Sequence, residues 1–222
     1  MLNKSFGCFI LYVLFVGTYG ICSYISYKRD MTMDLSLKIQ NTTREKLIQT
    51  YKNVWKLVFF NVGILTYPIF RFLSLFVPYN REFKFIDLLW EPFAILFLLD
   101  VFFFTTHYLF HCKFLYKKFH NIHHKITAPI GLSALYHHPI DYAFSNIIPS
   151  ALPVVVLRSS VPVFIAWAIL TAYHTVMVGH GGIKNKSEQH DIHHSKFTKN
   201  YGTGFGMDLL FGTSSDGKLH IL

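Results

Sequence analysis

The chain contains apolar runs that are longer than the elements of a soluble core need to be. The first covers residues 6–27 without a charged side chain, which is enough to cross about 30 Å of hydrocarbon at a rise of about 1.5 Å per residue. Of the whole chain, 52% is hydrophobic and only 15% is charged. Because the runs are continuous rather than alternating, they predict an all-α fold, an integral membrane helical bundle.

Three further apolar runs follow the first one. They cover residues 54–77, 85–112 and 143–178. Prolines and the polar stretch 158–160 break the last of these, which predicts two short helices that meet at the break, either as two full spans or as a hairpin that enters only part of the bilayer. The first run could also be a cleaved signal peptide, but it is longer than usual for one and no small-residue cleavage pattern follows.

Most of the 13 histidines fall into three tight clusters. The clusters are HYLFH at 107–111, HNIHH at 120–124 and HDIHH at 190–194. On a helix, residues four apart share a face, so each cluster can direct two or three ring nitrogens toward one point. Structural zinc takes four ligands and catalytic zinc takes three and a water. This many imidazoles therefore indicates two metal ions.

The arrangement of the apolar runs brings these clusters to one side of the membrane. The broken segment 143–178 returns the chain to the side it left, and all but five of the 21 Lys and Arg residues fall on that side. The positive-inside tendency predicts that this side is cytosolic. The net charge of +9 is then explained by topology and anionic lipid, and no nucleic-acid motif accompanies it. The three cysteines form no disulfide framework, which agrees with a reducing face.

Beyond the three clusters, the chain carries HPID at 138–141, His180 followed by Gly181, and MDLLFGT at 207–213. Together, in this order, the motifs resemble the fatty acid hydroxylase and sterol desaturase superfamily. Within it, the stretch HNIHHKITAPIGLSALYHHP is most similar to the sterol carbon-4 methyl oxidases. The resemblance covers roughly residues 100–217, about half of the chain. Three boxes in order are specific, whereas one HxxHH alone would be weak.

The resemblance implies a membrane enzyme of the endoplasmic reticulum with a di-iron centre that faces the cytosol; zinc could replace iron in purified protein. It implies one structural domain overall, with an amino-terminal transmembrane region at 1–84 and a catalytic region at 85–222. Carried over residue by residue, the metal ligands are His107, His111, His120, His123, His124, His138, His180, His190, His193 and His194. For His138 the motif leaves a ligand role and a neighbouring role equally open.

Asp100 falls where the superfamily has an acidic residue ahead of the first box. It could fix the tautomer of an imidazole from outside the metal shell, or it could simply be a buried acid paired with a neighbouring polar group. Three other histidines are expected to bind no metal. His137 reads as a neighbour of His138, His174 as a polar core residue and His220 as a surface residue.

The ligand type agrees with the activity that the resemblance implies, which is hydroxylation or desaturation of a lipid, foremost a sterol. Attack on an unactivated C–H bond needs an oxidant made from O2 and redox metals with open positions, and imidazoles suit iron. A fatty acid or sphingolipid hydroxylase is the alternative within the superfamily. The sequence has no dinucleotide fingerprint or haem motif, so electrons must come from a separate carrier. The resemblance implies a cytochrome b5-type donor and a reductase that uses NADH or NADPH.

The sequence departs from the superfamily at Tyr108, where an arginine is usual, and in the short segment 181–189. These departures concern loops near the expected cavity, so they bear on the substrate more than on the metal chemistry. Three other classes stay open: a metal transporter, a zinc hydrolase, and a catalytically inactive relative that binds sterol or lipid. A hydrolase would leave most of the histidines unexplained, and few acid or base groups accompany them.

Overall fold

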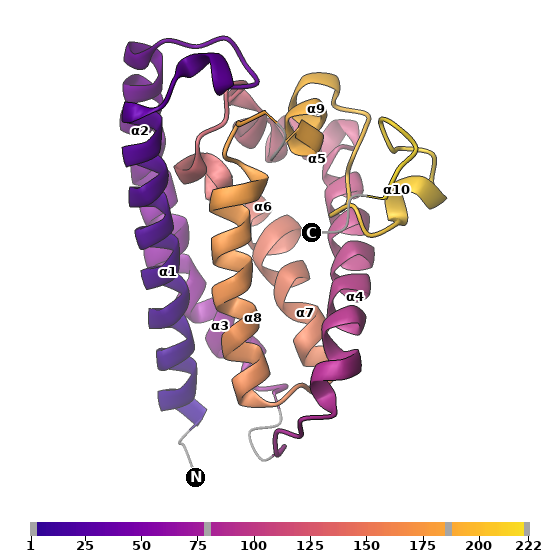
Figure 1. Ribbon diagram of the computed structural model, residues 1–222. Coiled ribbons are helices and arrows are strands. Elements are labelled where there is room, and N and C mark those ends of the chain that lie inside the picture. Colours follow the sequence, from indigo (N-terminus) through magenta and orange to yellow (C-terminus); the bar gives the residue numbers. More distant parts are fainter. Residues whose placement is uncertain (1–3, 78–80, 185–187, 220–222) are drawn as a thin grey trace.

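The computed structural model describes residues 4–77, 81–184 and 188–219, and within these ranges every regular element is a helix. Five helical stretches are long and apolar enough to cross a membrane: Ser5–Thr32, Arg44–Leu73, Asp87–Phe110, Pro139–Val156 and Val161–Gly179. They stand side by side in one bundle (Figure 1). The prediction of an all-α membrane bundle is confirmed.

The first two spans form the amino-terminal side of the bundle. Helix α1 covers Lys4–Thr32, and the second span consists of α2 at Arg44–Phe59, a π-helical turn at Phe60–Leu65 and α3 at Thr66–Leu73. This second helix begins ahead of the apolar run at 54–77, because Thr43 caps it and accepts from the backbone N–H of Lys46. The polar first turns of α2 therefore extend the helix beyond its apolar part.

The remaining spans carry the histidines at one end. Helix α4 covers Asp87–Phe110. The fourth span consists of α6 at Pro139–Asp141, a π-helical turn at Tyr142–Ile147 and α7 at Ile148–Val156. The fifth consists of α8 at Val161–His174 and a π-helical turn at Thr175–Gly179. By length and composition each could cross the membrane, as the prediction of two full spans requires.

The turn between α7 and α8 is the predicted polar break, and it is tied to the start of α4. Arg158 adopts a left-handed conformation there, with φ of 53°. The Arg81 guanidinium donates to the carbonyl oxygens of Leu157 and Arg158 and pairs with Glu91 at 2.9 Å. Ser159 donates to the same carboxylate at 2.7 Å. One charged network thereby joins α4 to the turn between α7 and α8 at the end of the bundle opposite the histidines.

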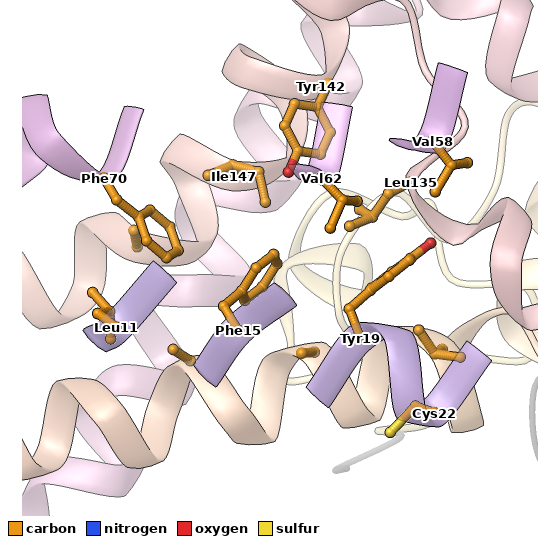
Figure 2. Close-up of a cluster of buried hydrophobic side chains, with 14 of the residues drawn as sticks. Leu11, Phe15, Tyr19, Cys22, Val58, Val62, Phe70, Leu135, Tyr142 and Ile147 are labelled. Carbon is orange, nitrogen blue, oxygen red and sulfur yellow. The ribbon is translucent and has the colours of Figure 1, made fainter. Parts of the chain in front are cut away.

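The hydrophobic core lies between α1 and the later spans (Figure 2). Phe15 of α1 packs edge to face on Phe70 of α3 with ring centroids 5.4 Å apart. Tyr19, also buried, donates from its hydroxyl to the carbonyl oxygen of Leu132 at 2.8 Å. The side-chain amide of Asn61 donates to the carbonyl oxygens of Leu135 and His137. The first two spans therefore support the loop that precedes α6.

Short elements cover the other end of the bundle, where the chain leaves the spans. They are α5 at Lys113–Lys118, the 3-10 helices at His120–Lys125 and Gly131–Leu135, α9 at Glu188–Lys196 and α10 at Met207–Leu210. The loop between α1 and α2 docks beside them. Buried Lys38 in this loop pairs with Asp30 at 2.8 Å and donates to the carbonyl oxygen of Gly181 at 2.9 Å. The amino-terminal spans and the histidine-bearing segments thus share contacts at this end.

Candidate metal centre

The described residues bring nine of the predicted histidines together in two groups. Within each group, one ring nitrogen of every residue lies within 4.8 Å of those of the others. The first group consists of His107, His111, His120, His124 and His193. The second consists of His123, His180, His190 and His194. Two convergent sets of nitrogens are the arrangement that two metal ions require.

In the first group, the last turn of α4 faces α9 and the 3-10 helix at His120–Lys125. The Nε2 atom of His111 lies 3.1 Å from Nε2 of His193 and 3.2 Å from Nε2 of His124. His124 in turn approaches His120, with Nε2 atoms 3.1 Å apart. His107 completes the group, and its ring centroid is 4.4 Å from that of His193.

The second group lies where the end of the fifth span meets α9. The Nε2 atom of His194 is 3.1 Å from Nε2 of His123 and 2.9 Å from Nε2 of His190. His180 follows the π-helical turn after α8, and its ring centroid is 4.0 Å from that of His190. His194 is also close to the first group, because its ring centroid is 4.6 Å from that of His124. The two groups are therefore neighbours.

The two HxxHH pentapeptides divide their histidines between the groups in opposite ways. In the first, the outer pair His120 and His124 enters the first group and His123 enters the second. In the last, the outer pair His190 and His194 enters the second group and His193 enters the first. In the last pentapeptide, on helix α9, the pair four residues apart stays together as α-helical geometry favours. In the first, the outer pair also stays together, although this segment is a 3-10 helix and not the expected α-helix. Each group is thus built partly from both pentapeptides.

Backbone and carboxylate oxygens hold the outer ring nitrogens. Nδ1 of His107 lies 2.8 Å from the carbonyl oxygen of Tyr201, and Nδ1 of His193 lies 2.8 Å from that of Lys199. A ring nitrogen beside a carbonyl oxygen is the protonated donor, so the Nε2 atoms keep their lone pairs. These lone pairs lie among the convergent ring nitrogens of the group, where a metal ion would accept them. The first group therefore fits a metal ion.

A different observation shows that the second group also fits a metal ion. Nε2 of His180 is buried and has no hydrogen-bond partner among the described residues, although it belongs to this convergent group. A buried nitrogen without a bonding partner lowers the stability of the fold, because it has lost its hydrogen bonds to water. Neutral imidazole suits iron, copper, nickel and zinc. Both groups therefore have the donor chemistry of a transition-metal site.

The surroundings keep these imidazoles neutral. Burial lowers the pKa of His111 to about 3, and the nearby ring of His120 lowers it further. Burial likewise lowers the pKa of His180 to about 3, with His137 adding to the effect. In α9, burial lowers the pKa of His193 well below its ordinary value. Because only a neutral imidazole binds a metal, the fold holds these ligands ready at neutral pH.

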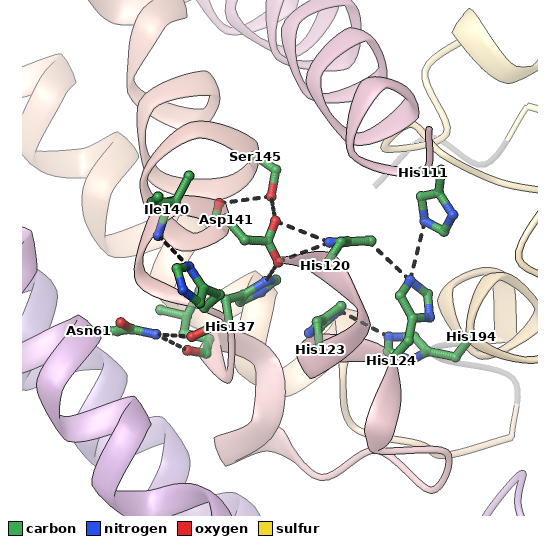
Figure 3. A network of polar contacts seen from close by, with 12 residues as sticks. Asn61, His111, His120, His123, His124, His137, Ile140, Asp141, Ser145 and His194 are labelled. Carbon is green, nitrogen blue, oxygen red and sulfur yellow. Dashed lines mark hydrogen bonds and ion pairs between the residues drawn. The ribbon is translucent and has the colours of Figure 1, made fainter. Parts of the chain in front are cut away.

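Asp141 links the outer sides of both groups (Figure 3). Its carboxylate lies 2.9 Å from Nδ1 of His120 and 2.8 Å from Nδ1 of His137, and Ser145 also donates to it. The ring of His137 stacks on that of His123, with centroids 4.0 Å apart and planes 10° from parallel. Sequence reasoning noted HPID as a motif but assigned Asp141 no role. Its spacing of four residues after His137 was the available signal.

Among the described residues Asp100 pairs with neighbouring polar groups, which is one of the two roles expected for it, and no hydrogen bond to an imidazole is seen. Its carboxylate accepts from the backbone N–H groups of Thr203 at 2.6 Å and Met207 at 2.8 Å. It lies two turns below His107 on α4, and the loop after α9 fills the intervening position. That loop begins at Tyr201, whose carbonyl oxygen holds His107. Asp100 therefore acts on the backbone that carries the acceptor.

Four histidines stay outside the two groups, and His137, which contacts Asp141, is one of them. Nδ1 of His138 accepts from the backbone N–H of Ile140 at 3.2 Å and caps α6, so the structure does not bring this predicted ligand to either group. His174 lies one turn before His180 and is not part of a group. His220 lies outside the described residues, as does the glycosylation sequon that begins at Asn185.

Comparison with known proteins places this site in a family. A family model described as fatty acid hydroxylase matches residues 92–213. Human fatty acid hydroxylase domain-containing protein 2 is 34% identical over 168 residues, which is 71% of this chain and 50% of that protein. A methylsterol monooxygenase of Gallus gallus is 28% identical over 193 residues, which is 75% of this chain and 64% of that protein.

A fatty acid hydroxylase of Mycosarcoma maydis is 28% identical over 177 residues, 74% of this chain and 45% of that protein. The chain thus spans about half the length of several of the curated relatives it matches. No solved structure matches it. With the family model over more than half of the chain and every histidine of the two groups inside the matched range, the chain belongs to the fatty acid hydroxylase family.

Proposed function

We propose that this chain is a membrane-bound oxygenase that holds two irons and uses O2 to hydroxylate or desaturate a lipid. The observation that carries the proposal is the pair of neighbouring imidazole groups, five and four histidines, that share the two HxxHH segments. A single zinc site would leave half of these ligands without a function. Two irons bound here would supply the oxidising power that an unactivated C–H bond demands.

Other residues of the chain orient the imidazoles and exclude water from them. The carbonyl oxygens of Tyr201 and Lys199 keep protons on Nδ1 of His107 and His193, so that their Nε2 atoms stay available as ligands. Burial keeps bulk water from the two groups and keeps the imidazoles uncharged. The sequence has no dinucleotide fingerprint or haem motif, so the electrons would come from a separate carrier. A cytochrome b5-type donor and an NAD(P)H reductase are the proposed partners.

For the substrate we propose a sterol, as the printed name of the Gallus gallus relative suggests for that protein. A fatty acid or sphingolipid is the second candidate, supported by the names of the human and Mycosarcoma maydis relatives. Apolar helices surround the site, which suits any of these lipids. A catalytically inactive lipid-binding relative is the alternative of another class.

We further propose that the histidine end faces the cytosol in the endoplasmic reticulum. All but five of the 21 Lys and Arg residues are expected on this side, which supports a cytosolic orientation by the positive-inside tendency. Asn41, in the sequon Asn41-Thr42-Thr43, lies on this side in the loop between α1 and α2. It is exposed and should carry no glycan in a eukaryotic cell; a glycan there would contradict the orientation.

The test is metal analysis of the detergent-purified chain, followed by lipid and sterol profiling of cells that express it. We expect about two irons per chain, as two separate imidazole groups require. His193→Ala removes a ligand and should lose iron, whereas the matched His174→Ala, outside both groups, should keep it. A newly oxidised lipid should appear only with the intact chain and the control.

The opposite results would separate the alternatives. One zinc or no metal, with unchanged lipids, would contradict the oxygenase and favour a lipid-binding relative. Oxygen uptake by the reduced protein should depend on added lipid, which neither a transporter nor a hydrolase would show.

A further inference from the structure

The segment after α9 lies along the outside of α4, below the level of the histidines. The ring of Phe205 is 6.4 Å from that of Phe97, and the ring of Phe211 stacks on that of Phe104 at 5.1 Å. Figure 1 shows α10 beside α4, well short of the top of the bundle. The segment at 202–211, called the tail segment here, therefore descends along a spanning helix.

The level of this contact falls within the thickness of a bilayer. Helix α4 has 24 residues and is about 36 Å long, against about 30 Å of hydrocarbon. Its first turn carries a charged cluster in which Arg81 pairs with Asp87 at 3.2 Å and with Glu91 at 2.9 Å, which marks one border of the hydrocarbon. Asp100, which holds the tail segment, lies only about 20 Å from that end. The hydrocarbon therefore extends past Asp100.

Several backbone N–H groups in and beside the tail segment donate to carboxylates within the protein. Asp208 accepts from the backbone N–H groups of Tyr201 and Gly202, both at 2.8 Å. Asp100 accepts from those of Thr203 and Met207. Lipid offers no hydrogen bonds, so irregular backbone at membrane depth needs partners of this kind. Two buried carboxylates that serve four backbone donors meet that need.

The outer edge of the tail segment is apolar. The side chain of Leu210 is 75% exposed and that of Phe211 is 60% exposed. Tyr108 and Leu109 of α4, each 49% exposed, lie at the end of the spanning helix against which the segment packs. The apolar edge thus lies beside exposed apolar side chains of α4.

We infer that the tail segment is a re-entrant element that lies in the bilayer, with Leu209, Leu210 and Phe211 in contact with phospholipid acyl chains. The inference goes beyond the proposed activity and does not depend on metal. It commits to bilayer lipid as the occupant of this edge, because the depth of the contact, the exposed apolar side chains and the backbone donors held by buried carboxylates suit a membrane environment. The same segment follows Tyr201, so membrane contact and the acceptor of His107 lie on one piece of chain.

The test is fluorescence quenching of a bimane label at Leu210→Cys in the full chain, reconstituted in phosphatidylcholine nanodiscs. Cys8, Cys22 and Cys112 are first replaced by alanine so that only the new thiol reacts. Nitroxide-labelled phosphatidylcholine quenches a label among acyl chains, and iodide quenches one in water. Phe93→Cys on the outer face of α4 is the lipid control, and Lys125→Cys is the water control.

We expect the label at Leu210→Cys to match the lipid control, with a ratio of nitroxide to iodide quenching several-fold above that of Lys125→Cys. A ratio equal to the water control would overturn the inference. Protection from both quenchers would also overturn it, because a second copy of the chain would then cover the edge. Leu209→Cys provides a second position on the same edge, and a melting temperature in detergent equal to that of the cysteine-free chain shows that each labelled variant is folded.

Discussion

Asp141 is a buried carboxylate that accepts from two imidazoles and a hydroxyl. Its contact with His120 fixes the proton on Nδ1 and directs Nε2 into the first group. Its contact with His137 orients a ring that stacks on His123 of the second group. A single side chain thus sets the orientation of imidazoles in both groups, although it belongs to neither. Such outer partners contribute to metal affinity through the geometry they impose.

Replacement of Asp141 should weaken metal binding while every proposed ligand remains. For Asp141→Ala we expect metal affinity to fall about 10-fold to 100-fold, the range found for partners of ligating histidines. Asp141→Asn should be intermediate, because one amide oxygen can still accept from one ring. Competition with a chelator of known affinity measures the effect. The exposed Asp216→Ala is the control, and equal affinities for all three variants would contradict the role.

At the scale of elements, the network around Arg81 holds three helices at one end of the bundle. The guanidinium joins Asp87 and Glu91 of α4 to the carbonyl oxygens at the turn between α7 and α8. Glu91 is almost fully buried, so its charge depends on this partner. The fixed turn sets where α8 begins, and α8 in turn leads to His180. The network therefore fixes the start of α8, at the end of the bundle opposite the histidines.

Arg81→Met should destabilise the bundle, because it leaves a buried carboxylate without its cation. We expect a loss of about 3 kcal/mol, the lower end for a broken buried pair, since Arg81 itself is partly exposed. Thermal unfolding in detergent measures the change. Lys84→Met nearby on the surface should have little effect. Adding Glu91→Gln to Arg81→Met should restore part of the loss, and a double variant no more stable than the single one would count against the explanation.

At the scale of the whole molecule, the bundle gathers many histidines in one buried region. Burial and the nearby rings lower the pKa values of His111 and His180 to about 3, and burial lowers that of His193 well below its ordinary value. The unfolded chain would protonate the same rings near their ordinary value of 6.5. Stability of the metal-free protein therefore depends on pH.

Below pH 6.5 the unfolded state takes up protons that the folded state refuses, so the metal-free protein should lose stability as pH falls from 6.5 toward 3. Each such group contributes about 1.4 kcal/mol per pH unit across that interval. Melting temperature in detergent between pH 8 and pH 4 measures this, with His111→Phe expected to give a shallower decline. A flat profile below pH 6.5 would contradict the lowered pKa values.

Much of the site was predictable because helical periodicity is local. Spacings of four residues in the boxes placed His107 with His111 and His120 with His124 before any fold was considered. Which pentapeptide residue joins which group was not predictable, because it depends on how α9 meets the helix at His120–Lys125. The same holds for His138, which caps α6, and for Asp100, whose partners lie about a hundred positions later in the chain.

The contacts of the first two spans determine which part of the chain must be kept together when the histidine site is transferred to another protein. The family match begins at residue 92, yet Tyr19 and Asn61 donate to the backbone of the loop before α6, and Lys38 donates to Gly181 beside His180. These three donors lie outside the matched range. A gene fragment cut at the family boundary would therefore separate the histidines from groups that hold their scaffold in place, and the exchangeable unit in protein engineering is the whole five-helix bundle.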